Sequence, residues 1–282
     1  MQIGAFSPEI HASDVEGVFA RAQALGFTQM QYDFISSHGE EMPEAFYPNE
    51  VERVAQAARD YGIQITAVNG TFNMIDRDEA LLQENIRRFR LIAEAARALD
   101  CGVVTLCTGS RHPESMWRYH SDTAGEDAWQ QLLRTTRAIL PFAEENGVVL
   151  GVETEASNTV FTIERTRRFL DEIANPRLKV IMDCANLFPA GTAHRENMRP
   201  TIRKAFDLLG QDIVLAHGKD VCEGDEVRFA APGNGIVDYG YYFSLLKGTD
   251  YNGGLILHGI HAEDEFEPSI SFIRGELERA EL

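Results

Sequence analysis

Four stretches of the chain share one pattern, a short aliphatic and β-branched run that ends in a carboxylate or an imidazole. The runs end at Glu153, Asp183, His217 and His258, with intervals of 30, 34 and 41 residues. These side chains can bind metal ions and can also transfer protons. Each alone has an ordinary structural explanation, such as an ion pair for Glu153 or a hydrogen-bonded core position for His258. The repetition indicates a shared site.

Continuous apolar runs are typical of parallel strands covered by helices on both faces. Each interval can hold one helix, two loops and the next strand. Four strand ends meet only if parallel strands curve around one axis, as in a (β/α)8 barrel, whose chemistry lies at the carboxyl ends of its strands. The sequence therefore predicts an α/β fold, a single TIM barrel domain over residues 1–282.

Earlier segments extend this alternation of strands and helices. Ser13 is expected to cap the first helix, and Glu16 to complete a capping box. Asp238 is expected to cap a late helix after a tight turn at Gly233 and Gly235. The further predicted strands span residues 2–6, 28–33, 63–68 and 102–107, and the predicted helices include 48–61, 78–99, 124–146, 162–174, 197–209 and 238–247.

Composition excludes several functional classes. The chain carries 26 Lys and Arg against 44 Asp and Glu, a net charge of −18, which disfavours nucleic acid as a partner. Its four cysteines show no CxxC pair or disulfide spacing and are expected to be reduced. We see no leader and no apolar stretch long enough to cross a membrane, so we expect a cytoplasmic protein.

The four strand-end residues suggest one bound divalent cation. A mixed oxygen and nitrogen set suits Mn²⁺, Fe²⁺, Co²⁺ or Zn²⁺ better than Ca²⁺, with Mn²⁺ preferred and Mg²⁺ also considered. Such an ion acidifies the C–H bond next to a carbonyl and stabilises the enediolate that follows proton removal. Glu153 is the expected base, and Glu155, two residues along the same strand, is the alternative. Lys219 is expected either to donate to a substrate oxygen or to pair with Asp220 or a neighbouring strand's carboxylate.

Substrate-binding residues are expected in the loops after the strands. The loop over residues 108–120 combines polar and aromatic side chains, and the alternative is a loop that packs on its own Trp117. Asn69 ends the third predicted strand, and Asn186 follows Asp183 by three residues. The expected substrate-binding set is Asn69, Thr108, Arg111, Trp117, His120, Glu155 and Asn186.

Several motifs resemble those of xylose-isomerase-like TIM barrels, the superfamily of sugar phosphate isomerases and epimerases. They are Gly-Val-Glu-Thr-Glu at Glu153, Ile-Met-Asp-Cys-Ala-Asn-Leu at Asp183, Ala-His-Gly-Lys-Asp at His217, and Gly-Asn-Gly-Ile-Val-Asp from Gly233. The resemblance implies a metal-dependent isomerase or epimerase that acts on a ketose or related polyol ketone. It also implies that Asn186 touches substrate hydroxyls, and it suggests a homodimer.

One ligand departs from that family pattern. Ketose 3-epimerases hold the metal with Glu, Asp, His and a second Glu, and the two glutamates move the proton; here the second Glu position falls on His258. A neutral imidazole there could bind metal or relay a proton. The departure favours the alternative of a dehydratase of the inosose or dehydroshikimate type, because that reaction needs one base and one acid.

Other functions are weighed against this resemblance. The endonuclease IV branch binds three zinc ions through many histidines, and the chain has only eight histidines and an acidic balance. A barrel that binds a ligand without metal is the non-enzymatic alternative. A phosphorylated substrate is disfavoured because Lys219 and Arg228 share their segment with Glu223, Asp225 and Glu226.

Overall fold

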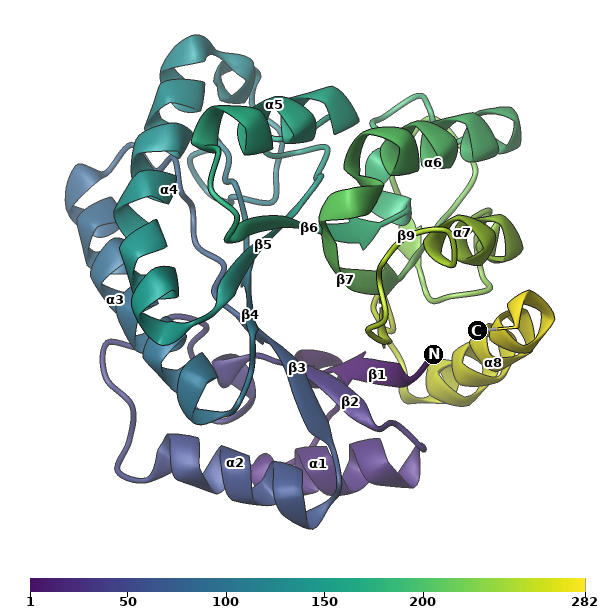
Figure 1. The fold of residues 1–282 in the computed structure, drawn as a ribbon, viewed down its shortest axis with the longest axis horizontal. Helices are drawn as coiled ribbons and strands as arrows, with labels where there is room; N and C mark the ends of the chain where they lie inside the picture. The colour runs from purple at the N-terminus through teal and green to yellow at the C-terminus, as the bar shows by residue number, and fades with distance from the viewer. Residues whose placement is uncertain (282) are drawn as a thin grey trace.

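The computed structural model describes residues 1–281, whose central feature is a closed barrel of parallel strands (Figure 1). Each strand pairs with its neighbour in chain order, and β10 closes the barrel against β1. The predicted TIM barrel is therefore confirmed. The strands are β1 (Ile3–Phe6), β2 (Gln29–Tyr32), β3 (Gln64–Asn69), β4 (Val103–Leu106), β5 (Val149–Glu153), β6 (Leu178–Asp183), β7 (Ile213–Gly218) and β10 (Leu255–Leu257).

Helices surround the barrel on its outside, as Figure 1 shows. The predicted helix boundaries agree with the structure to within two residues. The capping prediction for the first helix is wrong: the carboxylate of Asp14, not Ser13, accepts the N–H of Gly17 at 2.8 Å. The helices are α1 (Val15–Ala24), α2 (Glu50–Asp60), α3 (Glu79–Ala98), α4 (Glu126–Asn146), α5 (Ile163–Ile173), α6 (Arg195–Leu209), α7 (Tyr239–Leu246) and α8 (Phe266–Ala280).

A small apolar layer lies inside the barrel, separate from the main core. It consists of Ala67, Ile181, Leu215 and Ile256. Each of these residues precedes a predicted site residue by two positions, and side chains two apart in a strand point to the same face. The layer therefore lies directly below the site, and the polar residues at the strand ends face the same interior. Its members precede Asn69, Asp183, His217 and His258, respectively.

A short antiparallel hairpin, β8 (Asp220–Val221) and β9 (Phe229–Ala230), follows β7. Its anchor is Asp220, which is 1% exposed and accepts N–H groups from Val221, Gly233 and Val237 at 2.9, 3.0 and 2.9 Å. The turn then leads into α7, where Asp238 caps the helix by accepting the N–H of Tyr241, as predicted. These contacts fix the segment directly after Lys219.

Two further expectations concern the cysteines and membrane-spanning helices. All four cysteines are free in the structure, as predicted. Within residues 1–281, every helix is too short or too polar to span a lipid bilayer.

Close packing around Asp220 makes Gly235 a sensitive position. A Cβ at Gly235 would collide with the carboxylate of Asp220 and the carbonyl oxygen of Val221. We expect Gly235→Ala to lower the free energy of unfolding by about 1–3 kcal/mol, the usual cost of overpacking, as measured by urea denaturation. The matched control is Gly102→Ala, where a Cβ meets nothing within 4 Å. Equal stability of the two variants would contradict the expectation.

Candidate metal centre and active site

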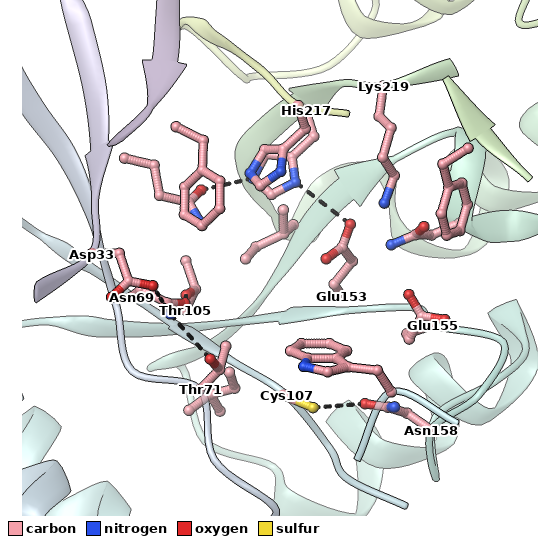
Figure 2. A pocket seen from close by; sticks show the side chains of 18 of the residues that line it. Asp33, Asn69, Thr71, Thr105, Cys107, Glu153, Glu155, Asn158, His217 and Lys219 are labelled. Carbon is pink, nitrogen blue, oxygen red and sulfur yellow. Dashed lines mark hydrogen bonds and ion pairs between the residues drawn. The ribbon is translucent and has the colours of Figure 1, made fainter. Parts of the chain in front are cut away.

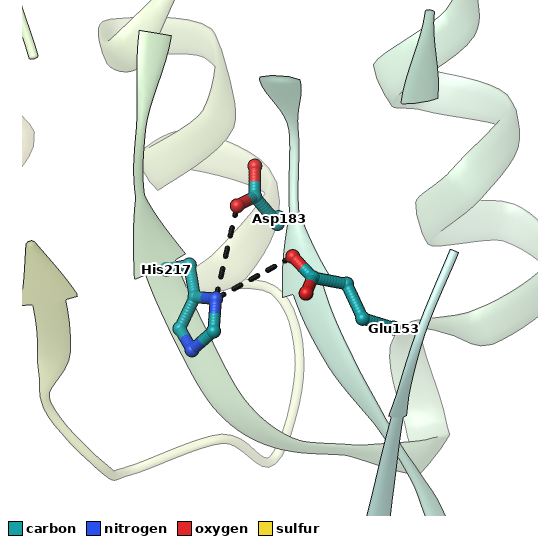
Figure 3. A group of neighbouring side chains, drawn as sticks. All are labelled: Glu153, Asp183 and His217. Atoms are coloured by element: carbon teal, nitrogen blue, oxygen red, sulfur yellow. Dashed lines mark ion pairs between the residues drawn. The ribbon is translucent and has the colours of Figure 1, made fainter. Parts of the chain in front are cut away.

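Three of the four predicted metal ligands converge at the carboxyl ends of adjacent strands (Figure 3). Glu153 ends β5, Asp183 ends β6, and His217 lies on β7 directly opposite Asp183 in the strand register. The Nδ1 atom of His217 is 3.5 Å from Oε1 of Glu153 and 3.7 Å from Oδ2 of Asp183. One ligand atom from each residue lies within 4.8 Å of the others.

The chemistry of these atoms fits a divalent cation. Oε1 of Glu153 and Oδ2 of Asp183 are buried without a hydrogen-bond partner among the described residues. On the far side of the imidazole ring, Nε2 of His217 lies 2.8 Å from the amide oxygen of Gln31. An amide oxygen only accepts, so Nε2 carries a proton, and Nδ1 is the ring atom that faces the carboxylates and offers a lone pair to a cation when the ring is neutral. Two orphaned carboxylate oxygens and an oriented imidazole match the ligand set of a divalent metal.

Electrostatics also favour a cation here. Burial and the charge of Asp183 raise the pKa of Glu153. Burial opposes ionisation of Asp183, but the charges of Lys219 and His217 outweigh it and hold its pKa below the usual range. Burial likewise opposes the charged form of His217, yet the adjacent carboxylates of Asp183 and Glu153 raise its pKa to about 9. The buried carboxylates of this cluster therefore favour a positively charged group or ion beside them.

His258, the fourth predicted ligand, lies beside this group and outside it. Its ring stacks between Phe6 and His217, with centroid separations of 4.3 and 4.4 Å. Its Nδ1 is 3.8 Å from Oε1 of Glu9, and its Nε2 is buried without a partner among the described residues. Burial, followed by the charges of His217 and Lys219, lowers its pKa well below the usual value. The group of three converging ligands therefore does not include His258 in this geometry, and metal binding by His258 stays a prediction.

A cavity of about 510 Å³ opens above the three ligands at the carboxyl ends of the strands (Figure 2). A volume of this size suits a small-molecule ligand. Both Glu155 and Lys219 face it, as the two-residue period from Glu153 and His217 predicts. The predicted site residues that line it are Asn69, Trp117, Glu153, Glu155, Asn186, His217, Lys219 and His258.

Lys219 is held firmly beside the ligand group. Its Nζ lies 3.3 Å from Oδ2 of Asp183 and 4.0 Å from the ring centroid of Phe229. Of the two ion pairs considered from the sequence, the structure forms the one with a neighbouring strand's carboxylate. Burial opposes its charge, but the three acidic side chains around it raise its pKa. Burial raises the pKa of Glu155, on the same wall, to about 7.

Three predicted substrate-binding residues do not line the cavity. The guanidinium of Arg111 donates to the carbonyl of Ile75 at 2.6 Å and pairs with Asp127 at 3.4 Å. Thr108 is 1% exposed and accepts the N–H of Val160. His120 accepts the N–H of Asp122 at the start of a single helical turn, Ser121–Ala124. All three shape the long loop that presents Trp117 to the cavity, because loop backbone needs such internal partners.

Sequence reasoning missed the wall opposite Glu153. Asn69 links three residues of this wall by hydrogen bonds. Its amide nitrogen donates to Asp33 at 2.5 Å and to Thr71 at 3.1 Å, and its oxygen accepts from Thr105 at 2.8 Å. Gln31 and Asp33 were detectable, because polar residues alternating along a buried strand must point into a site. The missed lining residues include Gln31, Asp33, Glu41, Thr71, Thr105, Cys107 and Asn158.

Comparison with known proteins identifies the family. Residues 19–276 match the family described as xylose isomerase-like TIM barrel. The chain belongs to this family. An inosose dehydratase from Glaesserella parasuis serovar 5 (strain SH0165) is 23% identical over 245 residues, which cover 80% of this chain and 77% of that protein.

Solved structures share the fold of this xylose isomerase-like barrel. The 3-keto-D-glucoside 4-epimerase from E. coli superposes with a TM-score of 0.75 at 18% identity, covering 98% of this chain and 99% of that one. An IolI protein with a bound zinc atom gives a TM-score of 0.71 at 15% identity, covering 99% of this chain and 98% of that one.

The geometry predicts how metal content responds to substitution. We expect the wild-type protein, stripped with chelator and reconstituted, to bind about one divalent ion per chain by mass spectrometry. Asp183→Asn and His217→Ala should each lose it, since each removes one of three converging ligands. His258→Ala and Glu155→Gln should retain it. If His258→Ala also lost the metal, this result would contradict the three-ligand centre and support a centre with four ligands.

A pH effect follows from Asp33, which is 2% exposed. Burial first, and the charge of Glu41 second among the raising effects, bring its pKa to about 7 from 3.8. Between about pH 4 and pH 7 the folded protein therefore binds more protons than the unfolded chain, so Asp33 makes the free energy of unfolding fall as pH rises.

We expect this decline to be smaller in Asp33→Asn, which has no carboxylate to ionise. In the presence of chelator, the free energy of unfolding of the variant minus that of the wild type should rise by about 3 kcal/mol between pH 4.5 and pH 7.5. Urea denaturation measures it, with Asp60→Asn on the exposed end of α2 as the control. A difference that does not change with pH would contradict the expectation.

Proposed function

We propose that this protein is a divalent-metal-dependent sugar isomerase or epimerase that acts on a ketose or related polyol ketone through an enediolate. The observation that carries the proposal is the convergence of Glu153, Asp183 and His217 at the base of a cavity, where two buried carboxylate oxygens have no hydrogen-bond partner among the described residues. Such a site binds a cation and a small polar molecule together.

The named relatives support the choice of substrate class. An inosose dehydratase and a 3-keto-D-glucoside 4-epimerase are both named for carbohydrates that carry a ketone. The zinc atom in the IolI structure supports a divalent metal in this fold. Mn²⁺ remains our first choice, because mixed carboxylate and imidazole sets accept it readily.

The bound ion would supply Lewis-acid polarisation of the substrate carbonyl and the neighbouring hydroxyl. Glu153 is then placed to remove the proton from the carbon next to that carbonyl. Its Oε1 faces the three-ligand centre, and burial raises the pKa of the metal-free carboxyl above its usual value. Glu155 is the alternative base, because it lines the same cavity and belongs to no ligand group.

Lys219 and His258 complete the proposed machinery. The ammonium of Lys219 lies beside Asp183 and faces the cavity, where it can donate to the oxygen that gains charge as the proton leaves. His258 also lines the cavity, and its unpartnered Nε2 is available to exchange a proton with the substrate. The carboxylates of β5 and the imidazole that follows β10 thus border one cavity.

One observation favours a second function, a lyase that removes water from the same enediolate. The position after β10 carries a histidine whose pKa is lowered, where a two-carboxylate epimerase needs a second glutamate. One base and one acid suffice for dehydration. The 23% identity to an inosose dehydratase points the same way.

Exchange of substrate hydrogen with solvent deuterium tests the shared chemistry. We expect the reconstituted enzyme to incorporate deuterium next to the carbonyl of a ketose or inosose, and Glu153→Gln to lose at least about 100-fold of this activity. Glu155→Gln is the matched variant, and a larger loss there would assign the base to Glu155.

Product mass decides between the two functions. Isomerisation and epimerisation conserve the unlabelled substrate's mass, whereas a lyase releases one water. Absence of exchange with every ketone tested, in protein shown to hold metal, would contradict both functions.

A further inference from the structure

The wall of the cavity away from the metal ligands is acidic. Asp33, Glu41 and Glu155 all line it. Asp33 directly follows β2, Glu41 lies farther along the same loop, and Glu155 follows β5, so carboxyl groups border the cavity on more than one side. A ligand that enters meets carboxylate oxygens over much of this surface.

The cavity lining has few positively charged side chains, and the ammonium of Lys219 is already paired with a carboxylate. Among the described residues that line the cavity, Lys219 is the sole lysine or arginine. Its Nζ is 3.3 Å from Asp183 and sits over the ring of Phe229. Arg111, the nearby arginine that the sequence suggested, points its guanidinium at Ile75 and Asp127 instead. The cavity therefore lacks the cluster of cations that recognises a phosphate or carboxylate group.

Two amide groups on the lining already donate to the protein, whereas one buried acceptor has no partner among the described residues. The amide groups of Asn69 and Asn158 already donate to Asp33 and to the carbonyl of Met116 at 2.5 and 2.9 Å. By contrast, Oδ1 of Asn186 has no partner among the described residues, although this side chain is 2% exposed and lines the cavity. A buried acceptor without a donor costs free energy, so the site is completed by a ligand that donates.

We infer that the substrate is an uncharged polyhydroxy ketone whose hydroxyl groups donate to Glu41, Glu155 and Asn186, and that the site rejects phosphorylated and carboxylated analogues. Hydroxyls supply the donors that this wall needs, whereas phosphate and carboxylate groups supply only acceptors and negative charge. The inference rests on the proposed function, since it assigns the substrate class of that same cavity.

Trp117 gives a direct readout of binding. The chain has two tryptophans. Trp117 is 52% exposed and lines the cavity, whereas Trp129 is fully buried. Ligand binding should therefore change the emission of Trp117, and Trp117→Phe should remove that change. The probes are 2-keto-myo-inositol, D-tagatose and D-tagatose 6-phosphate, titrated into metal-reconstituted protein.

We expect at least one neutral probe to bind about tenfold or more tightly than the phosphate ester. Glu41→Lys should reduce this preference, because it places a cation on the cavity wall. Glu52→Lys is the matched control, since Glu52 is 74% exposed on the outer face of α2 and changes the net charge equally. The control should leave the preference unchanged.

Three outcomes would overturn the inference: equal or tighter binding of the phosphate ester, a preference that Glu41→Lys leaves intact, or no binding of any neutral probe. Failure of the proposed function would give a different experimental result. Neutral probes would then quench Trp117 without deuterium exchange. Conversely, exchange that the phosphate ester inhibits as strongly as the neutral probes would retain the function and refute the substrate class.

Discussion

The burial of two carboxylates beside each other is the constraint on which the rest of the site depends. Glu153 and Asp183 end neighbouring strands and point to one place, where each has a buried oxygen without a hydrogen-bond partner among the described residues. Like charges in a poorly hydrated interior repel, and each carboxylate also loses its hydration. His217 and Lys219 both lie close to this pair. Positive charge beside the two acids therefore stabilises the arrangement.

The barrel supplies the rigidity that this arrangement requires. Strand register sets Asp183 opposite His217, and the apolar layer two residues earlier closes the interior below them. Gln31 reaches His217 from the far side of the barrel and fixes which imidazole nitrogen carries the proton. Asp220, fastened by three backbone N–H groups, fixes the chain immediately after Lys219. Each polar group is thus positioned by a separate element.

Much of this could be predicted from the sequence because strands have a strict period. The apolar runs located the strand ends, and the two-residue alternation correctly turned Glu155 and Lys219 toward the cavity. Loop residues have no such period. Arg111 turns away because it finds a backbone carbonyl at Ile75, 36 residues earlier in the chain. The pairing of His217 with Gln31 joins residues 186 apart, which local sequence patterns do not reveal.

His258 then has an explanation in charge balance. In the proposed centre, Glu153 and Asp183 would neutralise a divalent ion, and an imidazole at residue 258 would add no further negative charge beside it. The imidazole at this position avoids that charge, and the carboxylate of Glu9 sits behind it, accepting N–H groups from Gly259 and Ile260 at 2.8 and 3.2 Å. A centre without net negative charge opposes the charge of a developing enediolate less. The departure at residue 258 is therefore compatible with the proton removal that we propose.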